Sequence, residues 1–194
     1  MVASLKISSP TIALGKARKM SIDRFRQWQP RDGWKYDWNN GTTIKYKTMV
    51  SEKQRYIVRN VLRAFHSTNS YKLGHDLLPE TEMAYDNNRY RIPDIAYYTR
   101  EQTKAAAAGE HTLSPFIIEI LSDTDLQKNI ENKLWEYFEE GVQVVWHILP
   151  YRQLVKVYTS PRHVQILTDD EVCSAQPALP DFELTVNQVF ELTD

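Results

Sequence analysis

The sequence predicts an α/β fold, with a mixed central β-sheet flanked by helices, from three features. Phe116 to Leu121 and Val142 to Leu149 are apolar runs of the kind found in strands buried on both faces. Apolar residues recur at helical spacing near 51–66 and 124–140. Between 31 and 49, alternating residues surround an Asn-Asn-Gly turn, which predicts an extra N-terminal β-hairpin.

The first part of the chain is basic and polar. We expect residues 1–19 to form a loose basic arm and residues 20–194 to form one domain, since 194 residues suit a single core. A short helix is predicted over 20–29, ending at Pro30. In the hairpin that follows, the alternating aromatic residues are expected to close a core: Trp34, Tyr36 and Trp38.

The remaining elements follow in order. Ser51 can cap a helix that runs to Phe65. The segment 99–114 contains four consecutive alanines and a glycine and is interpreted as a surface excursion. Further strands are expected at 71–76, 80–85, 90–98, 154–159 and 163–167, and the tail, 178–190, is expected to form a loop and a short helix.

A carboxylate interrupts the most apolar strand. Glu119 lies within the run from Phe116 to Leu121, where an ionised side chain costs several kcal/mol unless a cation or donor meets it. Ser122, Asp123 and Thr124 can cap the following helix, on which Leu126, Ile130 and Tyr137 define the buried side and Lys133 projects with them. Lys133 could instead extend its ammonium to the rim of the helix.

A second carboxylate, Asp94, follows Pro93 in the largely apolar strand predicted at 90–98. Two carboxylates on adjacent central strands, with a lysine on the neighbouring helix, suit a hard divalent cation such as Mg²⁺. Such a cation lowers the pKa of bound water and neutralises charge on a phosphodiester. Single buried acids also occur for structural reasons, so this pattern alone leaves both interpretations open.

Composition excludes several classes of protein. The formal net charge of −1 gives no overall attraction to nucleic acid or membrane, although the N-terminal half is locally basic. Cys173 is the single cysteine, which excludes an internal disulfide and favours a reducing compartment, with the cytoplasm as the default. No apolar run is long enough to span a bilayer, and no P-loop, G-x-S-x-G or G-x-G-x-x-G motif is present, so a nucleotide cofactor is not expected.

These residues carry a resemblance to a known family. The segments RIPDIAYY, FIIEILSDTD, NKLWEYFEEGVQVVWHILP, LVKVY and LPDFELTV resemble the Uma family of restriction-endonuclease-like proteins, within the PD-(D/E)XK nuclease superfamily. The likeness covers the chain from Trp34 to the C-terminus. It implies a restriction-endonuclease-like core that hydrolyses DNA phosphodiesters with Mg²⁺, for which Mn²⁺ can substitute.

The resemblance also implies roles for residues. Asp94, Glu119 and Ile120 would hold the metal, and Asp94, Glu119 and Lys133 would be catalytic. In the common superfamily pattern the lysine stands two residues after the glutamate, where this chain has Leu121; here it has moved to the helix as Lys133.

The chain departs from the family at auxiliary positions. Asn129 stands where an aspartate is frequent, four residues before the lysine, and Gln54 stands where a histidine is frequent in the first helix. Glu52 is a candidate accessory acid, but its projection away from the apolar face argues against it. His147 is expected on the far side of its strand from the metal pocket or in a plain hydrogen bond.

Two functions remain open. The first is a Mg²⁺-dependent endodeoxyribonuclease, favoured by the joint presence of the three catalytic residues. The second is a catalytically weak nuclease-fold protein that binds nucleic acid or protein as a dimer, favoured by Asn129, Gln54 and the lack of net basic charge. A homodimer is expected in either case, because Trp135 projects away from the buried side of its helix.

Overall fold

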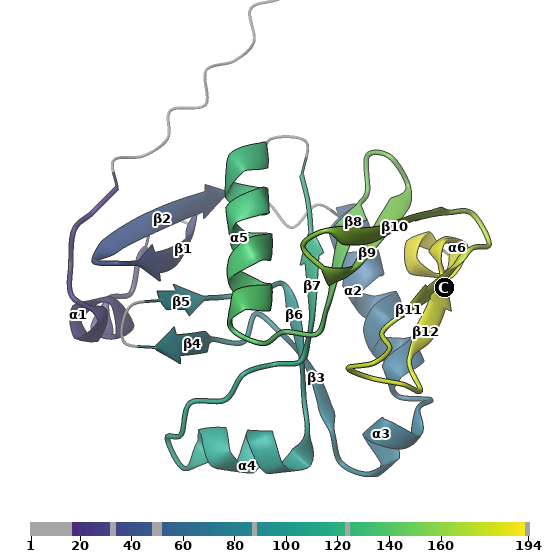
Figure 1. The fold of residues 1–194 in the computed structure, drawn as a ribbon, viewed down its shortest axis with the longest axis horizontal. Helices are drawn as coiled ribbons and strands as arrows, with labels where there is room; N and C mark the ends of the chain where they lie inside the picture. Colours follow the sequence, from purple (N-terminus) through teal and green to yellow (C-terminus); the bar gives the residue numbers. More distant parts are fainter. Residues whose placement is uncertain (1–16, 32–33, 48–51, 87–88, 123–124, 193–194) are drawn as a thin grey trace, which may run out of the picture.

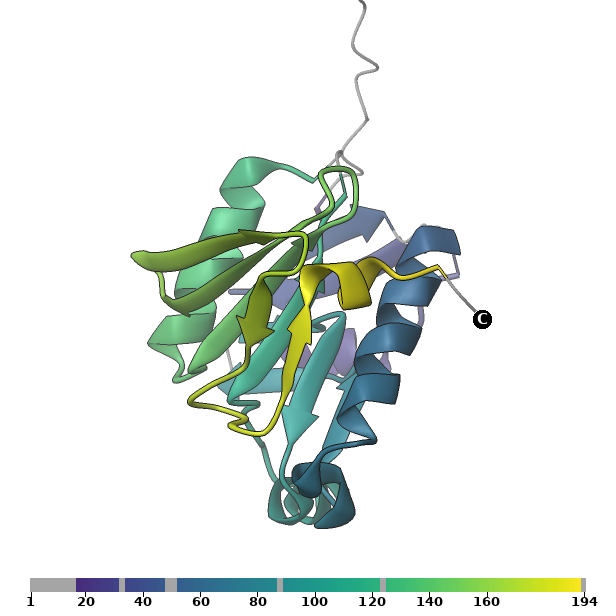
Figure 2. The same cartoon turned by 90° about the vertical axis from the view of Figure 1, so that its right-hand side faces the viewer.

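Strands occupy the centre of the structure and helices cover them on both sides (Figures 1 and 2). The computed structural model describes residues 17–31, 34–47, 52–86, 89–122 and 125–192. Residues 1–16 of the expected arm lie outside this part. Arg18 and Lys19, the two described residues nearest the end of the expected arm, contact Thr43 and Thr42 of the N-terminal hairpin. The division between an arm and a domain at residue 19 stays a prediction.

The central sheet has six strands in the order β10-β9-β8-β7-β6-β3. Of the neighbouring pairs in this sheet, β7 and β8 run parallel and are joined by the crossover helix α5. The other pairs are antiparallel, so the sheet is mixed, as predicted. The strands are β3 (Asp76–Pro79), β6 (Ile95–Tyr98), β7 (Phe116–Ile120), β8 (Val144–Leu149), β9 (Leu154–Ser160) and β10 (His163–Thr168).

The two apolar runs lie in the middle of this sheet. Every residue of β7 and of β8 is buried, as expected of strands covered on both faces. On one face, α5 (Gln127–Glu139) contributes Leu134 and Tyr137 to a core with Ile117 and Val145. On the other face lie α2 (Glu52–Phe65), α6 (Val186–Phe190) and the two-stranded sheet of β11 (Val172–Ser174) and β12 (Glu183–Thr185).

A second sheet carries the N-terminal hairpin, in the order β2-β1-β5-β4. Its strands are β1 (Trp34–Asn39), β2 (Thr42–Lys47), β4 (Met83–Asp86) and β5 (Arg89–Arg91), and α1 (Ile22–Gln27) packs beside it. The hairpin turn has positive φ at both Asn40 and Gly41, the backbone that asparagine and glycine tolerate best. Of the aromatic residues expected to close a core, Tyr36 and Trp38 form a third core with Phe25 and Tyr90, and Trp34 lies at its margin.

Several predicted elements were wrong. The segment 71–76 is not a strand: its first two residues end α3 (Asn69–Lys72), which has Thr68 as its N-cap, and β3 starts only at Asp76. The long strand predicted at 90–98 divides at Pro93 into β5 and β6, which belong to different sheets. The alanine-rich segment has no buried residue in α4 (Arg100–Ala107), as expected of a surface excursion, but this helix, held by a capping box between Thr99 and Gln102, was not predicted.

The start of the crossover helix also differs from the prediction. Leu126 is its N-cap residue, has no side-chain cap, and is half exposed rather than buried. The predicted cap residues Asp123 and Thr124 lie outside the described residues. Among the described residues, no helix is both long and apolar enough to cross a membrane.

Candidate active site

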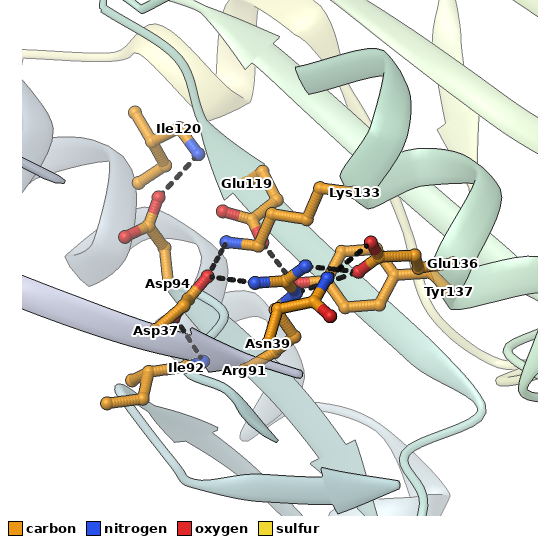
Figure 3. A network of polar contacts seen from close by, with 10 residues as sticks. All are labelled: Asp37, Asn39, Arg91, Ile92, Asp94, Glu119, Ile120, Lys133, Glu136 and Tyr137. Carbon is orange, nitrogen blue, oxygen red and sulfur yellow. Dashed lines mark hydrogen bonds and ion pairs between the residues drawn. The ribbon is translucent and has the colours of Figure 1, made fainter. Parts of the chain in front are cut away.

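The sheet brings Asp94 and Glu119 together. β6 and β7 pair antiparallel with Ile95 opposite Ile118, so one further residue along this register places Asp94 opposite Glu119. The carboxylate of Asp94 is held by the backbone of the neighbouring strand, because the N–H of Ile120 donates to its Oδ2 at 2.7 Å (Figure 3). Pro93, which precedes Asp94, ends the pairing of β5 and directs the chain into the central sheet.

Helix α5 supplies the lysine. The Lys133 Nζ lies 2.7 Å from Glu119 Oε1, so the lysine meets the buried acid instead of extending to the rim of the helix. One turn later, the Tyr137 hydroxyl donates to the same oxygen at 2.5 Å. Both side chains reach Glu119 because residues four apart lie on one side of a helix, and Figure 3 shows them converging on the strand.

Burial controls the charge of this pair. Glu119 is 7% exposed, and this desolvation raises its pKa to about 7, an effect that Asp94 reinforces and Lys133 opposes. For Lys133, burial acts to lower the pKa, but the nearby carboxylates of Glu119, Asp37 and Asp94 outweigh it and the net shift is upward. The lysine is therefore charged at neutral pH and stabilises Glu119 as a carboxylate.

A third carboxylate, Asp37, lies next to the lysine and was not predicted. It comes from β1, is 2% exposed, and has its Oδ2 3.9 Å from Lys133 Nζ. The same oxygen lies 3.3 Å from the Arg91 guanidinium, which also pairs with Glu136 of α5. The sequence held a signal for Asp37: in the WKYDWN strand it alternates with the aromatic residues, so it must face away from their core.

His147 lies on the same face of the sheet as Glu119, which corrects the expectation that it faces the far side. The two residues are register partners in the parallel pair of β7 and β8, and side chains at one level of neighbouring strands share a face. Its ring packs against Tyr158 with centroids 5.0 Å apart. Burial, together with Lys133 and Lys156, lowers the pKa of His147 to about 3, so it is neutral at physiological pH.

The auxiliary residues lie in the first turns of α5 and α2. Asn129 is half-buried in the first turn of α5, one turn before Lys133. Gln54 is half-buried in the first turn of α2, on the other face of the sheet from α5. Glu52 begins α2, and its side chain lies outside what the structure describes.

The donor set at the strand ends consists of oxygen atoms. Among the described residues, no group of three or more histidine, cysteine, aspartate or glutamate side chains could hold a metal ion. Mg²⁺ nevertheless binds through as few as one or two carboxylates, with water and substrate phosphate as its other ligands. Asp94 and Glu119 thus fit Mg²⁺, whereas a zinc site of four protein ligands is excluded within this part of the chain.

Comparison with known proteins supports this assignment of fold. A crystal structure from Anabaena variabilis, described as "a putative nuclease belonging to DUF820", superposes with a TM-score of 0.74 and 19% sequence identity. The match covers 88% of this chain and 97% of that one, so the two share a fold. No curated protein matches the chain.

Residues 22–187 match the profile of a sequence family, Uma2, described as "Putative restriction endonuclease". This range includes all three sheets described above, α5, and the charged side chains around Glu119 and Lys133. The chain therefore belongs to the Uma2 family.

Proposed function

We propose that this protein is a Mg²⁺-dependent endonuclease that hydrolyses phosphodiester bonds of DNA in the cytoplasm. The observation that carries the proposal is the 2.7 Å contact between Lys133 and Glu119, next to Asp94 on the adjacent strand. A buried carboxylate beside a half-buried one, with an ammonium in contact, is an arrangement that can bind a cation and stabilise the negative charge that develops during phosphodiester hydrolysis. Membership of the Uma2 family is consistent with it.

Asp94, Glu119 and Ile120 are the residues proposed to hold the cation. The side chain of Ile120 has no donor atom, so only its backbone carbonyl could serve. In an extended strand the N–H and C=O of one residue point to the same side. Because the Ile120 N–H meets Asp94, its carbonyl is directed to that side as well. When bound, Mg²⁺ would supply a nucleophilic water and neutralise phosphate charge.

Lys133 and Tyr137 have separate roles in the proposal. The ammonium of Lys133 offsets the charge that develops on the phosphate oxygens and orients the attacking water, since it remains protonated beside three carboxylates. The Tyr137 hydroxyl fixes Glu119 Oε1 in one direction, which limits the freedom of the proposed metal ligand.

We further propose that the protein acts as a homodimer, because Trp135 is 44% exposed on the outer side of α5. A symmetric pair of sites suits cleavage of both strands of a duplex. The expected Mg²⁺ use, DNA substrate and dimer are parts of this proposal and are tested separately.

The direct test is nicking of supercoiled plasmid by the purified protein with Mg²⁺ or Mn²⁺, and with EDTA. Glu119→Gln should abolish nicking, because it removes the charge while nearly keeping the shape of the side chain. Glu183→Gln, the same change at an exposed position of β12, is the matched control and should cleave like the wild type. Binding of plasmid without cleavage in either metal would contradict the enzyme and favour the binding module.

A further inference from the structure

The carboxylate of Asp37 is held by contacts that do not involve the active-site lysine. Its Oδ1 accepts a hydrogen bond from the backbone N–H of Ile92 at 3.2 Å, and its Oδ2 lies 3.3 Å from Arg91 Nη1. Both donors come from the chain around β5, next to β1 in the second sheet. The carboxylate therefore has a defined orientation and a compensating charge that do not depend on Lys133.

Lys133 lies between two carboxylates that differ in function. Glu119 Oε1 is 2.7 Å from its Nζ and belongs to the proposed metal site, whereas Asp37 Oδ2 is 3.9 Å away and is held by Arg91 (Figure 3). A divalent cation on Glu119 would weaken the attraction of that carboxylate for an ammonium. A lysine side chain has four rotatable bonds, so without a second acceptor it would leave the site.

We propose that Asp37 is a positioning residue that holds the Lys133 ammonium at the active site while Glu119 binds its cation. The inference rests on the proposed function, because it gives the lysine a task during catalysis. It assigns the second sheet a part in the site: the pair of Arg91 and Asp37 sets where the lysine is, and Arg91 joins that pair to Glu136 on the same helix.

A purely structural role for Asp37 makes a different prediction. In that case Asp37 would only attach the hairpin to α5, and any other contact between the two would serve equally. The chain offers a matched control, Asn39, two residues further along β1 and on the same face. Its Nδ2 donates to Glu136 Oε1 at 3.1 Å, so Asn39→Ala removes a hairpin contact to α5 that does not involve the lysine.

The first arm of the test uses no metal and no substrate. Urea unfolding in EDTA is measured for the wild type, Asp37→Asn, Lys133→Met and the double variant. If Asp37 holds the lysine, Asp37→Asn should lower the urea midpoint less in the Lys133→Met background than in the wild type. Equal shifts in both backgrounds would overturn the proposal. If Asp37→Asn does not fold, Asp37→Glu, which keeps the charge but moves it by one methylene, takes its place.

The second arm measures Mn²⁺ binding by calorimetry with the same four proteins and Asn39→Ala. Without Asp37, a cation that binds Glu119 must displace the ammonium from the site altogether, so the Mn²⁺ Kd should rise by roughly 10- to 100-fold. In the Lys133→Met background the change should be small. An equal rise in both backgrounds would mean that Asp37 acts on the cation directly, which would overturn the positioning role.

Plasmid cleavage completes the test. Asp37→Asn should lower kcat with little change in KM, because the lysine is misplaced while DNA still docks. Asn39→Ala should leave Mn²⁺ affinity and kcat unchanged, and a loss equal to that of Asp37→Asn would reduce Asp37 to a structural contact. If none of the proteins binds Mn²⁺ while the unfolding coupling persists, the proposed nuclease fails and the contact between Asp37 and Lys133 stands.

Discussion

At the scale of single residues, His147 is a buried base whose protonated form is disfavoured in the folded protein. Burial first, and then Lys133 and Lys156, lower its pKa from an ordinary 6.5 to about 3. Below pH 6.5 the unfolded chain takes up a proton at this position and the folded chain does not. The stability that the neutral ring contributes is thus fully present above pH 6.5 and is lost as the pH falls toward 3.

We expect this to appear as a pH-dependent difference between the wild type and His147→Gln. Between pH 6.5 and 5.0 the wild type should lose up to about 2 kcal/mol more unfolding free energy than the variant. Glu119, with its raised pKa, changes stability in the opposite direction over this range, but it does so in both proteins and cancels in the difference. Urea unfolding in EDTA at several pH values measures this difference in unfolding free energy. Parallel plots of unfolding free energy against pH for the two proteins would contradict the lowered pKa.

Sequence reasoning brought together those residues of the candidate site that lie close to one another along the chain. Glu119 and Lys133 belong to one strand and the next helix, so periodicity and the cost of a buried acid were sufficient to join them. Asp94 required the additional expectation that its strand is a neighbour. Asp37 could not be joined to them, because no local pattern states that β1 of a separate sheet packs against α5.

At the scale of elements, the prediction succeeded where one physical signal dominated. The burial of β7 and β8 followed from their composition, and the hairpin followed from its Asn-Gly turn. The failures were segments where weak signals competed. In 99–114, the glycine and polar residues suggested a loop, whereas the four alanines and the T-x-x-Q capping box favour the helix that the structure contains. In 90–98, the apolar pattern continues through Pro93, but proline cannot donate to a strand ladder and the pairing changes sheet there.

The connection between the hairpin and α5 depends on Arg91. Arg91 is 2% exposed, and its guanidinium pairs with Asp37 on β1 and with Glu136 on α5, so it joins the second sheet to the helix. Arg91→Met would leave both carboxylates without this cation in a buried setting. We expect a loss of about 3–5 kcal/mol in unfolding free energy, the usual cost of breaking a buried ion pair.

The matched control is Arg152→Met, which makes the same change at an exposed turn after β8. A surface arginine contributes little, so its unfolding free energy should stay within about 0.5 kcal/mol of the wild type. Chemical unfolding of the two variants side by side measures the difference. Equal stability of both would show that the network around Arg91 contributes nothing net.

At the scale of the whole molecule, three exposed apolar residues lie near one border of the central sheet: Trp135, Val164 and Ile166. β10 is an edge strand on which Val164 and Ile166 are 40% and 58% exposed, and both share the face of the sheet that carries Glu119. Trp135 of α5 lies nearby, since the Arg162 guanidinium is 5.9 Å from its ring centroid. An exposed edge strand with an apolar face is a common site of pairing between chains.

We expect the homodimer to use this border. Ile166→Lys should shift the protein toward monomer in sedimentation velocity at micromolar concentration, because a charge would be buried in the contact. Leu73→Lys changes an equally exposed apolar residue that follows α3 and should not alter the distribution. A wild type that sediments only as monomer would contradict the dimer, and an unaffected Ile166→Lys dimer would move the contact elsewhere.

The stability of the whole fold should report on the proposed metal site. A ligand that binds only the folded state raises unfolding free energy by RT ln(1 + [L]/Kd), which is about 2.7 kcal/mol at a free concentration of roughly 100 times Kd. For a chain of this size that corresponds to a rise in Tm of about 5–10 °C. Mn²⁺ should produce such a rise in the wild type, measured by thermal unfolding with and without the metal.

The Mn²⁺-induced rise in Tm should differ among variants of the candidate site residues. Asp94→Asn and Glu119→Gln should abolish it, because each removes one of the two charges that attract the cation. Lys133→Met should retain it or enlarge it, since the ammonium within 2.7 Å of Glu119 competes with the cation for the same oxygen. The sign of the lysine effect separates the site from a nonspecific one. A cation bound elsewhere would give an equal shift in all four proteins, whereas one bound between Asp94 and Glu119 must distinguish the acids from the lysine.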